Sequence, residues 1–324
     1  MRNNIIRFLF IVVLSTAIQM PLLSQEKLKI AVVPKGKEAI FWKFVHGGVN
    51  IGAVTSKGVE IIWKAPQKED DIAQQISIIE QCVNEGVSGI ILSPINSDAL
   101  SKPVYKAMKK KIPVLIFDSA LKGIPGKDFV SFVGIDNRKA GKLAGENLIK
   151  LINGKGKVVL LRYVKGQANT IEREEGFLEA IVKEKDIELI EKDCYAGGTI
   201  NEAKKASMSL IGRLKEADGI FCPNEISTMG MLFALRDVKL ARKIKFIGFD
   251  ITKPLVEALQ NEEISMLVAQ DPSRTGYQSV KAIVDYIRGK KIPSTIDIGI
   301  RLVTRENLND PEIKSLYSMS SDVE

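Results

Sequence analysis

Short continuous apolar runs recur along this chain, separated by segments in which apolar residues repeat with a helical period. Apolar runs of this length that end at a polar residue are typical of parallel strands buried on both faces of a sheet. On this basis strands are expected at Leu28–Val33, Val59–Trp63, Gly89–Leu92, Val114–Phe117, Phe129–Val133, Val158–Leu161, Ile187–Ile190, Gly219–Cys222, Lys245–Phe249 and Met266–Ala269.

The intervening segments predict helices at Phe41–Ser56, Asp70–Glu85, Ala99–Lys110, Lys139–Asn153, Ile171–Lys185, Ile200–Leu214, Ser227–Asp237, Pro254–Gln260 and Arg274–Arg288. Such alternation implies parallel sheets with helices on both faces, which is the α/β class. The chain has 324 residues, more than one ordinary domain, so two doubly wound parallel-sheet lobes are expected. No Gly/Ser-rich linker separates them, which indicates that the chain crosses between the lobes more than once.

Four of these strands end at a single hydrogen-bonding side chain: Asp118, Asn224, Asp250 and Gln270. In open α/β sheets the carboxyl ends of the strands border the crevice where ligands bind. An Asp after a strand is about as often a turn residue or a helix cap, so the set carries more weight than any one member. Because none of the four is His or Cys, they predict a site that binds a polyhydroxy molecule without reacting with it.

The first residues have the pattern of a secretory signal. Arg2 and Arg7 precede the apolar core Phe8–Leu14, and small residues follow up to Ser24. This core is too short to span a membrane, so residues 1–24 are predicted to be removed, with Gln25 as the new terminus. The alternative is an uncleaved amphipathic anchor. We therefore expect a periplasmic or otherwise extracytoplasmic protein.

The amino-acid composition argues against a disulfide-stabilised fold and against nucleic-acid binding. Cys82, Cys194 and Cys222 are an odd number without CxxC spacing, which argues against a disulfide framework, although one pair could form; burial as small apolar residues is expected for all three. The net charge of +8 is spread thinly, and its densest run, Lys109–Lys111, ends a predicted helix and suits the helix dipole. With only 6% aromatic residues, a nucleic-acid partner is not expected.

Catalysis finds little support in the sequence. His46 is the single histidine, which excludes a multi-histidine metal site, and no metal or other cofactor is expected. The segment Gly154–Lys157 precedes a strand, so it predicts a turn and not a phosphate-binding loop. Asp118 and Asp250 could form a glycosidase pair, but no apolar surround that would raise one pKa is evident. A binding protein is favoured over an enzyme.

Several short motifs follow one another in the order typical of one family: Phe41-Trp42, Ser93-Pro94, Phe117–Ser119, Arg173–Phe177, Asn224-Glu225, Gly248–Asp250, Ala269–Asp271 and Leu302–Thr304. Each fragment is unspecific, but the ordered set is a strong signal. From about Lys27 to Asn307 the chain resembles type I periplasmic binding proteins of the ribose/galactose class, the substrate-binding subunits of sugar ABC importers.

The resemblance implies two similar lobes joined by three hinge crossings, near Ile135–Asp136, Gln270–Asp271 and Gly299–Ile300. The first lobe would take residues 25–135 and 271–299. The second would take residues 136–270 and 300–312, and residues 313–324 would form a tail. A monosaccharide-like ligand would bind between the lobes, and the partner would be an ABC permease/ATPase complex.

The resemblance also implies ligand contacts. Phe41 and Trp42 match an aromatic pair that covers one face of the sugar, with an extra donor on the Trp; the alternative is a core pair at a helix start. The matching polar contacts are Asp118, Arg173, Asn224, Asp250 and Gln270. Ionised acceptors make the stronger hydrogen bonds, and the amides offer both a donor and an acceptor to a hydroxyl.

The chain departs from the ribose binders at several of these positions. Ser119 stands where they carry Arg, Ala39-Ile40 replaces an Asn, and Ala196–Thr199 replaces an aromatic residue, with Tyr195 only nearby. Lys35 could supply a donor, as in furanosyl autoinducer-binding relatives, or could be a solvated loop residue. A ligand other than ribose is therefore plausible.

Two other uses of this fold remain open at the sequence level. The protein could be a ligand sensor for a chemoreceptor or an extracytoplasmic kinase, including a sensor of furanosyl autoinducer. A regulator of the lactose-repressor type would need an N-terminal helix-turn-helix, where this chain has an export signal instead.

Overall fold

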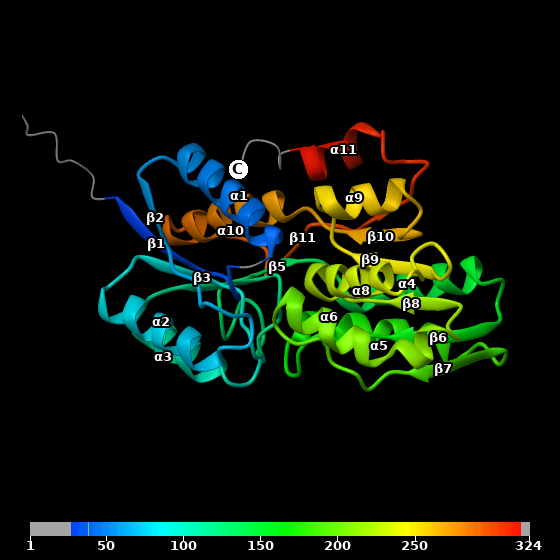
Figure 1. Ribbon diagram of the computed structural model, residues 1–324. Helices are drawn as coiled ribbons and strands as arrows, with labels where there is room; N and C mark the ends of the chain where they lie inside the picture. Colours follow the sequence, from blue (N-terminus) through cyan, green and yellow to red (C-terminus); the bar gives the residue numbers. More distant parts are fainter. Residues whose placement is uncertain (1–26, 38, 319–324) are drawn as a thin grey trace, which may run out of the picture.

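The computed structural model describes residues 27–37 and 39–318, and these form two α/β lobes that lie side by side (Figure 1). The predicted signal sequence lies outside the described residues. The sheet of the first lobe has the strand order β11-β5-β4-β3-β1-β2, with all neighbours parallel. Its strands are β1 (Leu28–Val33), β2 (Val59–Trp63), β3 (Gly89–Leu92), β4 (Val114–Phe117), β5 (Phe132–Gly134) and β11 (Thr295–Asp297).

The sheet of the second lobe repeats this order as β12-β10-β9-β8-β6-β7. Its strands are β6 (Gly156–Leu160), β7 (Ile187–Glu191), β8 (Gly219–Phe221), β9 (Lys245–Phe249), β10 (Met266–Ala269) and β12 (Arg301–Val303). Only the β10–β12 pair is antiparallel. The two lobes are therefore built on one plan, and a position in one has a counterpart in the other.

Helices cover the faces of both sheets (Figure 1). The first lobe has α1 (Ile40–Ser56), α2 (Ile72–Asn84), α3 (Ser101–Lys109) and α10 (Pro272–Ile287). The second has α4 (Asn137–Leu151), α5 (Ala168–Ile181), α6 (Ile200–Ser209), α7 (Ile211–Leu214), α8 (Glu225–Asp237), α9 (Lys253–Gln260) and α11 (Pro311–Ser318). The α/β class and the two-lobe architecture predicted from the pattern are confirmed.

The chain passes from one sheet to the other between β5 and α4, between β10 and α10, and between β11 and β12. At the first two passages an Asp caps the helix that follows: Asp136 accepts from the amide of Lys139, and Asp271 accepts from that of Arg274. At the third, Gly299 has a φ of +83°, a conformation that favours glycine. We propose that these three segments are the hinge.

Element boundaries differ from the sequence predictions in a few places. The strand expected from Phe129 begins at Phe132, because Phe129 instead forms an isolated bridge with Pro125. The strands β11 and β12 were missed, since each is only a short edge strand. The prediction of a tail from residue 313 was wrong for the described part: α11 packs near α9, and Ile313 is buried there.

Each lobe contains a pair of closely packed helices next to the hinge that depends on glycine. In the first lobe, a Cβ on Gly48 of α1 would lie 1.8 Å from the carbonyl oxygen of Ser273 in α10. In the second, a Cβ on Gly141 of α4 would lie 1.8 Å from the carbonyl oxygen of Arg173 in α5. No side chain fits at such distances, so the helix pairs that flank the hinge are held at a fixed close spacing.

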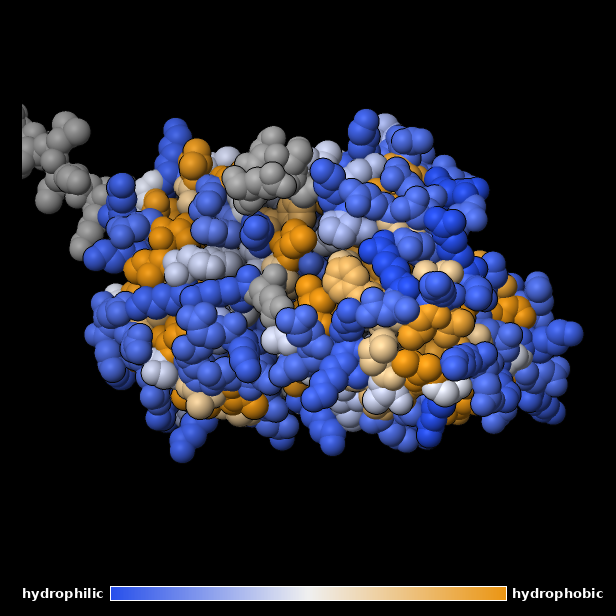
Figure 2. All heavy atoms as spheres, in the orientation of Figure 1, coloured by the Kyte–Doolittle hydropathy of each residue, from blue (hydrophilic) through white to orange (hydrophobic). Residues whose placement is uncertain are grey.

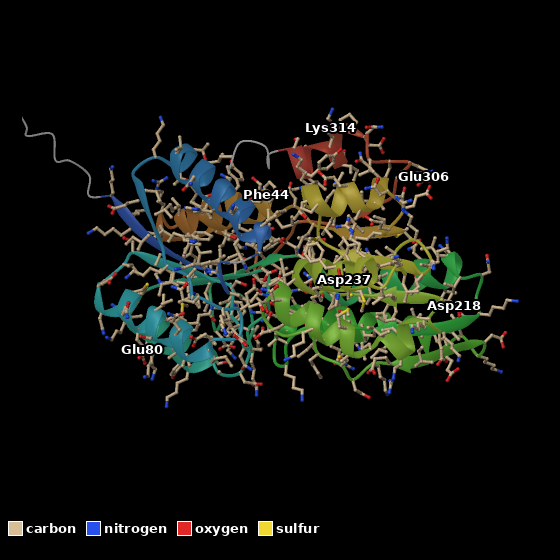
Figure 3. All side chains as sticks on the ribbon, in the orientation of Figure 1. Phe44, Glu80, Asp218, Asp237, Glu306 and Lys314 are labelled. Atoms are coloured by element: carbon tan, nitrogen blue, oxygen red, sulfur yellow. The ribbon has the colours of Figure 1, made fainter. Side chains whose placement is uncertain are left out.

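The face shown in Figure 2 is mostly hydrophilic, with apolar residues in small groups. Side chains from both lobes fill the space between the ribbons (Figure 3). Among the described residues, no helix combines the length and the apolar character needed to cross a membrane. All three cysteines are free; Cys82 and Cys222 are buried as expected, whereas Cys194 is only half-buried.

Candidate functional site

A cavity between the lobes lies where the strands of both sheets have their carboxyl ends. Its volume is about 30 Å³, within about 310 Å³ of space that atoms do not fill and that includes open solvent. We call it the interlobe cavity; it is lined by Lys35, Ala39, Phe41, Trp42, Glu69, Asp118, Asn169, Thr170, Arg173, Asn224, Glu225, Asp250 and Gln270. The structure thus brings together every residue predicted for the site except Ser119.

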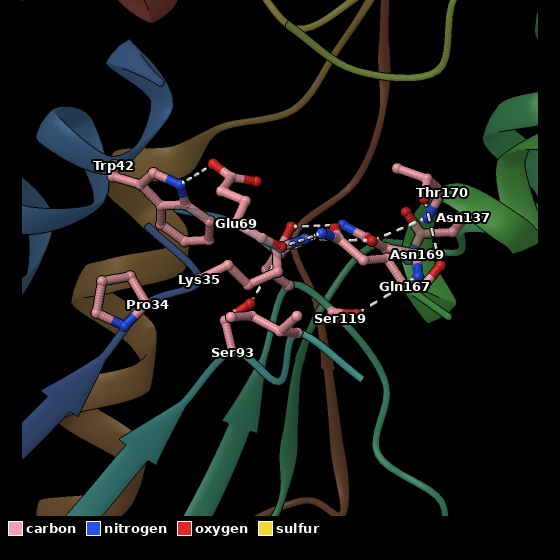
Figure 4. Close-up of polar contacts among 12 residues, drawn as sticks. Pro34, Lys35, Trp42, Glu69, Ser93, Ser119, Asn137, Gln167, Asn169 and Thr170 are labelled. Atoms are coloured by element: carbon pink, nitrogen blue, oxygen red, sulfur yellow. Dashed lines mark hydrogen bonds and ion pairs between the residues drawn. The ribbon is translucent and has the colours of Figure 1, made fainter. Parts of the chain in front are cut away.

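Lys35 follows β1 and is buried, with 3% of its surface exposed. Its Nζ lies 3.0 Å from Oδ2 of Asp118 in its own lobe. The same ammonium donates to Oε1 of Gln167 at 3.1 Å and to Oδ1 of Asn169 at 3.2 Å, both in the second lobe (Figure 4). An ammonium has three protons to donate. Lys35 therefore links the two lobes and is not the solvated loop residue considered as an alternative.

Asp118 directly follows β4 and has a φ of +60°. Its Oδ2 accepts from Oγ of Ser93 at 2.9 Å as well as pairing with Lys35. Its Oδ1 accepts from Nδ2 of Asn169 in the second lobe at 3.2 Å. Burial with several donors keeps this carboxylate in a defined orientation at the cavity wall.

Ser119 is fully buried but does not line the interlobe cavity. Its Oγ lies 3.5 Å from the backbone N–H of Asn169, which makes it a weak contact between the lobes (Figure 4).

Phe41 and Trp42 occupy the first turn of α1 and are both buried. Their rings meet edge to face, with centroids 4.9 Å apart, and Trp42 packs in the same way on Phe117 at 6.1 Å. The indole N–H of Trp42 donates to Oε1 of Glu69 at 2.5 Å. The extra donor expected from Trp42 is thus engaged within the protein, and the aromatic surface is what the pair presents to the cavity.

Glu69 was missed by the sequence reasoning. It precedes α2 within the polar run Gln67–Asp71, which has the composition of a solvated loop, yet only 4% of its surface is exposed. Its Oε2 accepts from the hydroxyl of Tyr163 in the second lobe at 3.2 Å. Burial raises the pKa of Glu69, and the nearby charge of Lys35 acts in the opposite direction.

Arg173 lies on α5 with its side chain almost fully buried. Its Nε donates to Oδ1 of Asn137 at 2.8 Å and its Nη1 to the carbonyl oxygen of Pro223 at 2.9 Å, while the guanidinium stacks 3.7 Å from the ring centre of Phe249. Its Nη2 is buried without a hydrogen-bond partner. A buried donor left unpaired is costly, so this atom calls for an acceptor that the protein does not supply.

Asp250 directly follows β9 with a φ of +69°. Its Oδ1 accepts from Nε2 of Gln270 at 2.9 Å, and its Oδ2 accepts from the backbone N–H of Glu225 at 3.0 Å. Burial raises the pKa of Asp250, although the charge of Arg173 opposes this. The expectation that no surround would raise the pKa of either Asp is therefore wrong for Asp250.

Asn224 and Glu225 begin α8. Asn224 is its N-cap: its Oδ1 accepts from the backbone N–H of Ser227 at 3.1 Å, so the carbonyl oxygen expected for a ligand serves the helix. Glu225 was missed, because an acid in the first turn of a helix is usually explained by that helix alone. Here its carboxylate contacts the other lobe, accepting from the backbone N–H groups of Ile40 and Phe41.

Known proteins share this architecture. The model of the periplasmic binding protein domain matches residues 30–291. The chain belongs to this family. The ribose import binding protein RbsB of Haemophilus influenzae is 27% identical over 237 residues, which cover 73% of this chain and 78% of that protein.

Solved structures agree with this assignment of the periplasmic binding protein. A periplasmic component of an ABC-type sugar transport system from Hahella chejuensis is 34% identical with a TM-score of 0.81, covering 85% of this chain and 99% of that one. An ABC transporter solute-binding protein from Agrobacterium vitis with bound D-fucose is 30% identical with a TM-score of 0.86, covering 89% and 99%. Both similarities extend over most of the chain.

Proposed function

We propose that this periplasmic binding protein captures a monosaccharide-like ligand in the interlobe cavity and delivers it to an ABC importer. The observation that carries the proposal is the unpartnered Nη2 of Arg173, buried in a wall of carboxylates and amides that come from both lobes. A sugar offers hydroxyl groups that donate to the carboxylates and oxygens that accept from the guanidinium. The aromatic pair Phe41–Trp42 suits the C–H face of a sugar ring.

The ligand contacts we propose are Phe41, Trp42, Asp118, Arg173, Asn224, Asp250 and Gln270. Lys35 and Ser119 were also predicted from the sequence as ligand contacts. We propose that they affect ligand binding indirectly, because their hydrogen bonds hold the two lobes together. The relatives that carry ribose or D-fucose in their names support the ligand class and not a particular sugar. Binding without conversion is favoured because the buried acids Glu69, Glu225 and Asp250 are hydrogen-bonded to protein donors.

A thermal-shift panel tests the ligand class on protein lacking residues 1–24. Pentoses, hexoses, their sugar alcohols and furanosyl autoinducer are added one at a time. A ligand that binds only the native state at a hundred times its Kd should stabilise it by about 2.7 kcal/mol. A panel in which no compound moves the melting temperature would sink the sugar assignment.

The variant Arg173→Lys tests whether the guanidinium of Arg173 binds the sugar. Lysine keeps the charge but loses the planar fork of donors, so the sugar that stabilises the wild type should bind at least about tenfold more weakly. Recovery of the unchanged sugar by NMR after prolonged incubation checks that nothing is converted. Fractionation of cells that express the full chain checks its export.

A further inference from the structure

The N-terminus of α1 receives its cap from the opposite lobe. Ala39 stands at the N-cap position and provides no side-chain acceptor, and the first turn of α1 carries no acidic residue. The first N–H groups of a helix need acceptors from outside it. In α1, the amide of Ile40 donates to Oε1 of Glu225 at 3.1 Å and that of Phe41 to Oε2 at 3.0 Å.

Glu225 is firmly held by its own lobe. It is the first residue of α8, only 3% of its surface is exposed, and its backbone N–H donates to Asp250. Its backbone is therefore fixed in the second lobe, and its carboxylate reaches α1 only when the second lobe lies against the first. The contact spans 184 residues of sequence between Phe41 and Glu225.

The capped turn is the one that carries the aromatic pair. Phe41 donates its own amide to Glu225, and Trp42 follows it in the same turn; both line the interlobe cavity. The other charged groups around this cavity are Lys35, Glu69, Asp118, Arg173 and Asp250. Of these, Asp250 and Glu69 act on Glu225 by charge repulsion.

We propose that Glu225 is a positioning residue: closure of the second lobe caps α1 through Glu225 and thereby sets Phe41 and Trp42 in place against the ligand. The part that concerns the ligand rests on the proposed function. The cap itself needs no ligand, because all of its atoms belong to the protein. The role of Glu225 as a cap and the proposed binding of a sugar can therefore be tested separately.

A disulfide between the lobes would hold them together without a ligand, so the cap can be studied separately from ligand binding. A Cβ on Gly198 of the second lobe would lie 3.3 Å from Cγ of Asp70 in the first, and the sulfur of a cysteine at position 70 would take the place of that Cγ. The locked protein carries Asp70→Cys and Gly198→Cys, with Cys194→Ser to prevent exchange with the neighbouring thiol. Trp63→Phe leaves Trp42 as the single tryptophan of the two in the chain.

Hydrogen exchange and fluorescence are then measured on the locked protein without sugar. In Glu225→Ala, the amides of Ile40 and Phe41 should exchange up to about tenfold faster, because each loses its hydrogen-bond acceptor on the buried carboxyl group. The fluorescence emission of Trp42 should shift toward that of the same protein after its engineered disulfide is reduced, when the lobes are free to separate. In Glu225→Gln, one of the two acceptor oxygens remains, so protection should return at one of the two amides and stay lost at the other.

Glu202→Ala serves as the control, since Glu202 is a first-turn acid of α6 whose contacts stay within its own lobe. Unchanged exchange and emission in locked Glu225→Ala would overturn the proposal. A cysteine pair that never crosslinks would also overturn it, because the closed arrangement that brings Glu225 to α1 would not be visited. Failure of the sugar panel would overturn the proposed function and leave these readouts unaffected.

Discussion

Asp118 and Asp250 occupy equivalent positions in the two lobes. Each directly follows a strand that has the same place in its sheet, β4 in the first lobe and β9 in the second. Each has a left-handed backbone, with φ values of +60° and +69°. Non-glycine residues rarely adopt this conformation, and Asp and Asn are among those that tolerate it best. The two carboxylates thus face one cavity through the same local geometry.

The left-handed backbone determines how Asp118 should be tested. Asp118→Asn keeps the tolerated conformation but removes the charge and replaces one acceptor oxygen with an NH2 donor, so it should weaken sugar binding by roughly one to two decades, as expected for a charged hydrogen bond of about 1.5–3 kcal/mol. Ser119→Ala, outside the cavity, should cost about one decade or less. Titration calorimetry compares the two variants, and the reverse order would mean that the first lobe binds the ligand elsewhere.

A pair of adjacent glycines in α1 tests the close helix contact. Gly48→Ala places a Cβ 1.8 Å from the carbonyl oxygen of Ser273, so α1 and α10 must separate, and unfolding free energy should fall by at least about 1–3 kcal/mol. Gly47→Ala is the control, because nothing lies within 4 Å of its Cβ and alanine favours the helix by about 0.5–1 kcal/mol. Urea denaturation measures both, and equal effects would contradict the packing described.

Ligand affinity should depend on pH through the buried acids. Burial, together with repulsion from Asp250 and Glu69, raises the pKa of Glu225 to about 8 even though the amides of α1 favour its ionised form. In an open, solvated cleft the ordinary value of about 4.3 applies. The closed form then binds more protons between these two values, so closure is favoured at lower pH and weakens as pH rises toward about 8.

Calorimetric titration with the sugar identified by the thermal-shift panel, at pH 5.5 and at pH 8.5, measures how the affinity depends on pH. Titration in buffers of different ionisation enthalpy should reveal proton uptake on binding at neutral pH. Glu225→Gln cannot titrate at this position and should flatten the profile, with a remainder from Glu69 and Asp250, whose pKa values burial also raises. Tighter binding at the higher pH would contradict this assignment.

The sugar should also change the shape of the protein. Phe41, Trp42 and Asp118 lie in one lobe and Arg173, Asn224 and Asp250 in the other, so a ligand that touches both groups must favour the closed form. Small-angle scattering with and without the sugar should show a smaller radius of gyration when it is bound. A tightly bound sugar that leaves the inter-lobe distances unchanged would show that closure is not the signal read by the importer.

Most of the strands and helices, and the polar residues at the strand ends, could be predicted from the amino-acid sequence. A buried parallel strand must be a continuous apolar run, and such runs are visible locally. The short edge strands β11 and β12 and the helix α11 were not predicted, because they lack such an apolar run. Asp118, Asp250 and Gln270 could be placed at one site because parallel strands bring their carboxyl ends to the same edge.

The partners of these residues within the protein could not be predicted, because they depend on how the two lobes pack together. Lys35 meets Gln167 and Asn169, and Glu225 meets Phe41, across the boundary between lobes whose relative placement no local pattern encodes. Glu69 looks like a solvated loop acid until folding buries it beside Trp42. Hydrogen bonds and charges act over a few ångströms in space, whatever the separation along the chain, so their partners are set by how the lobes pack.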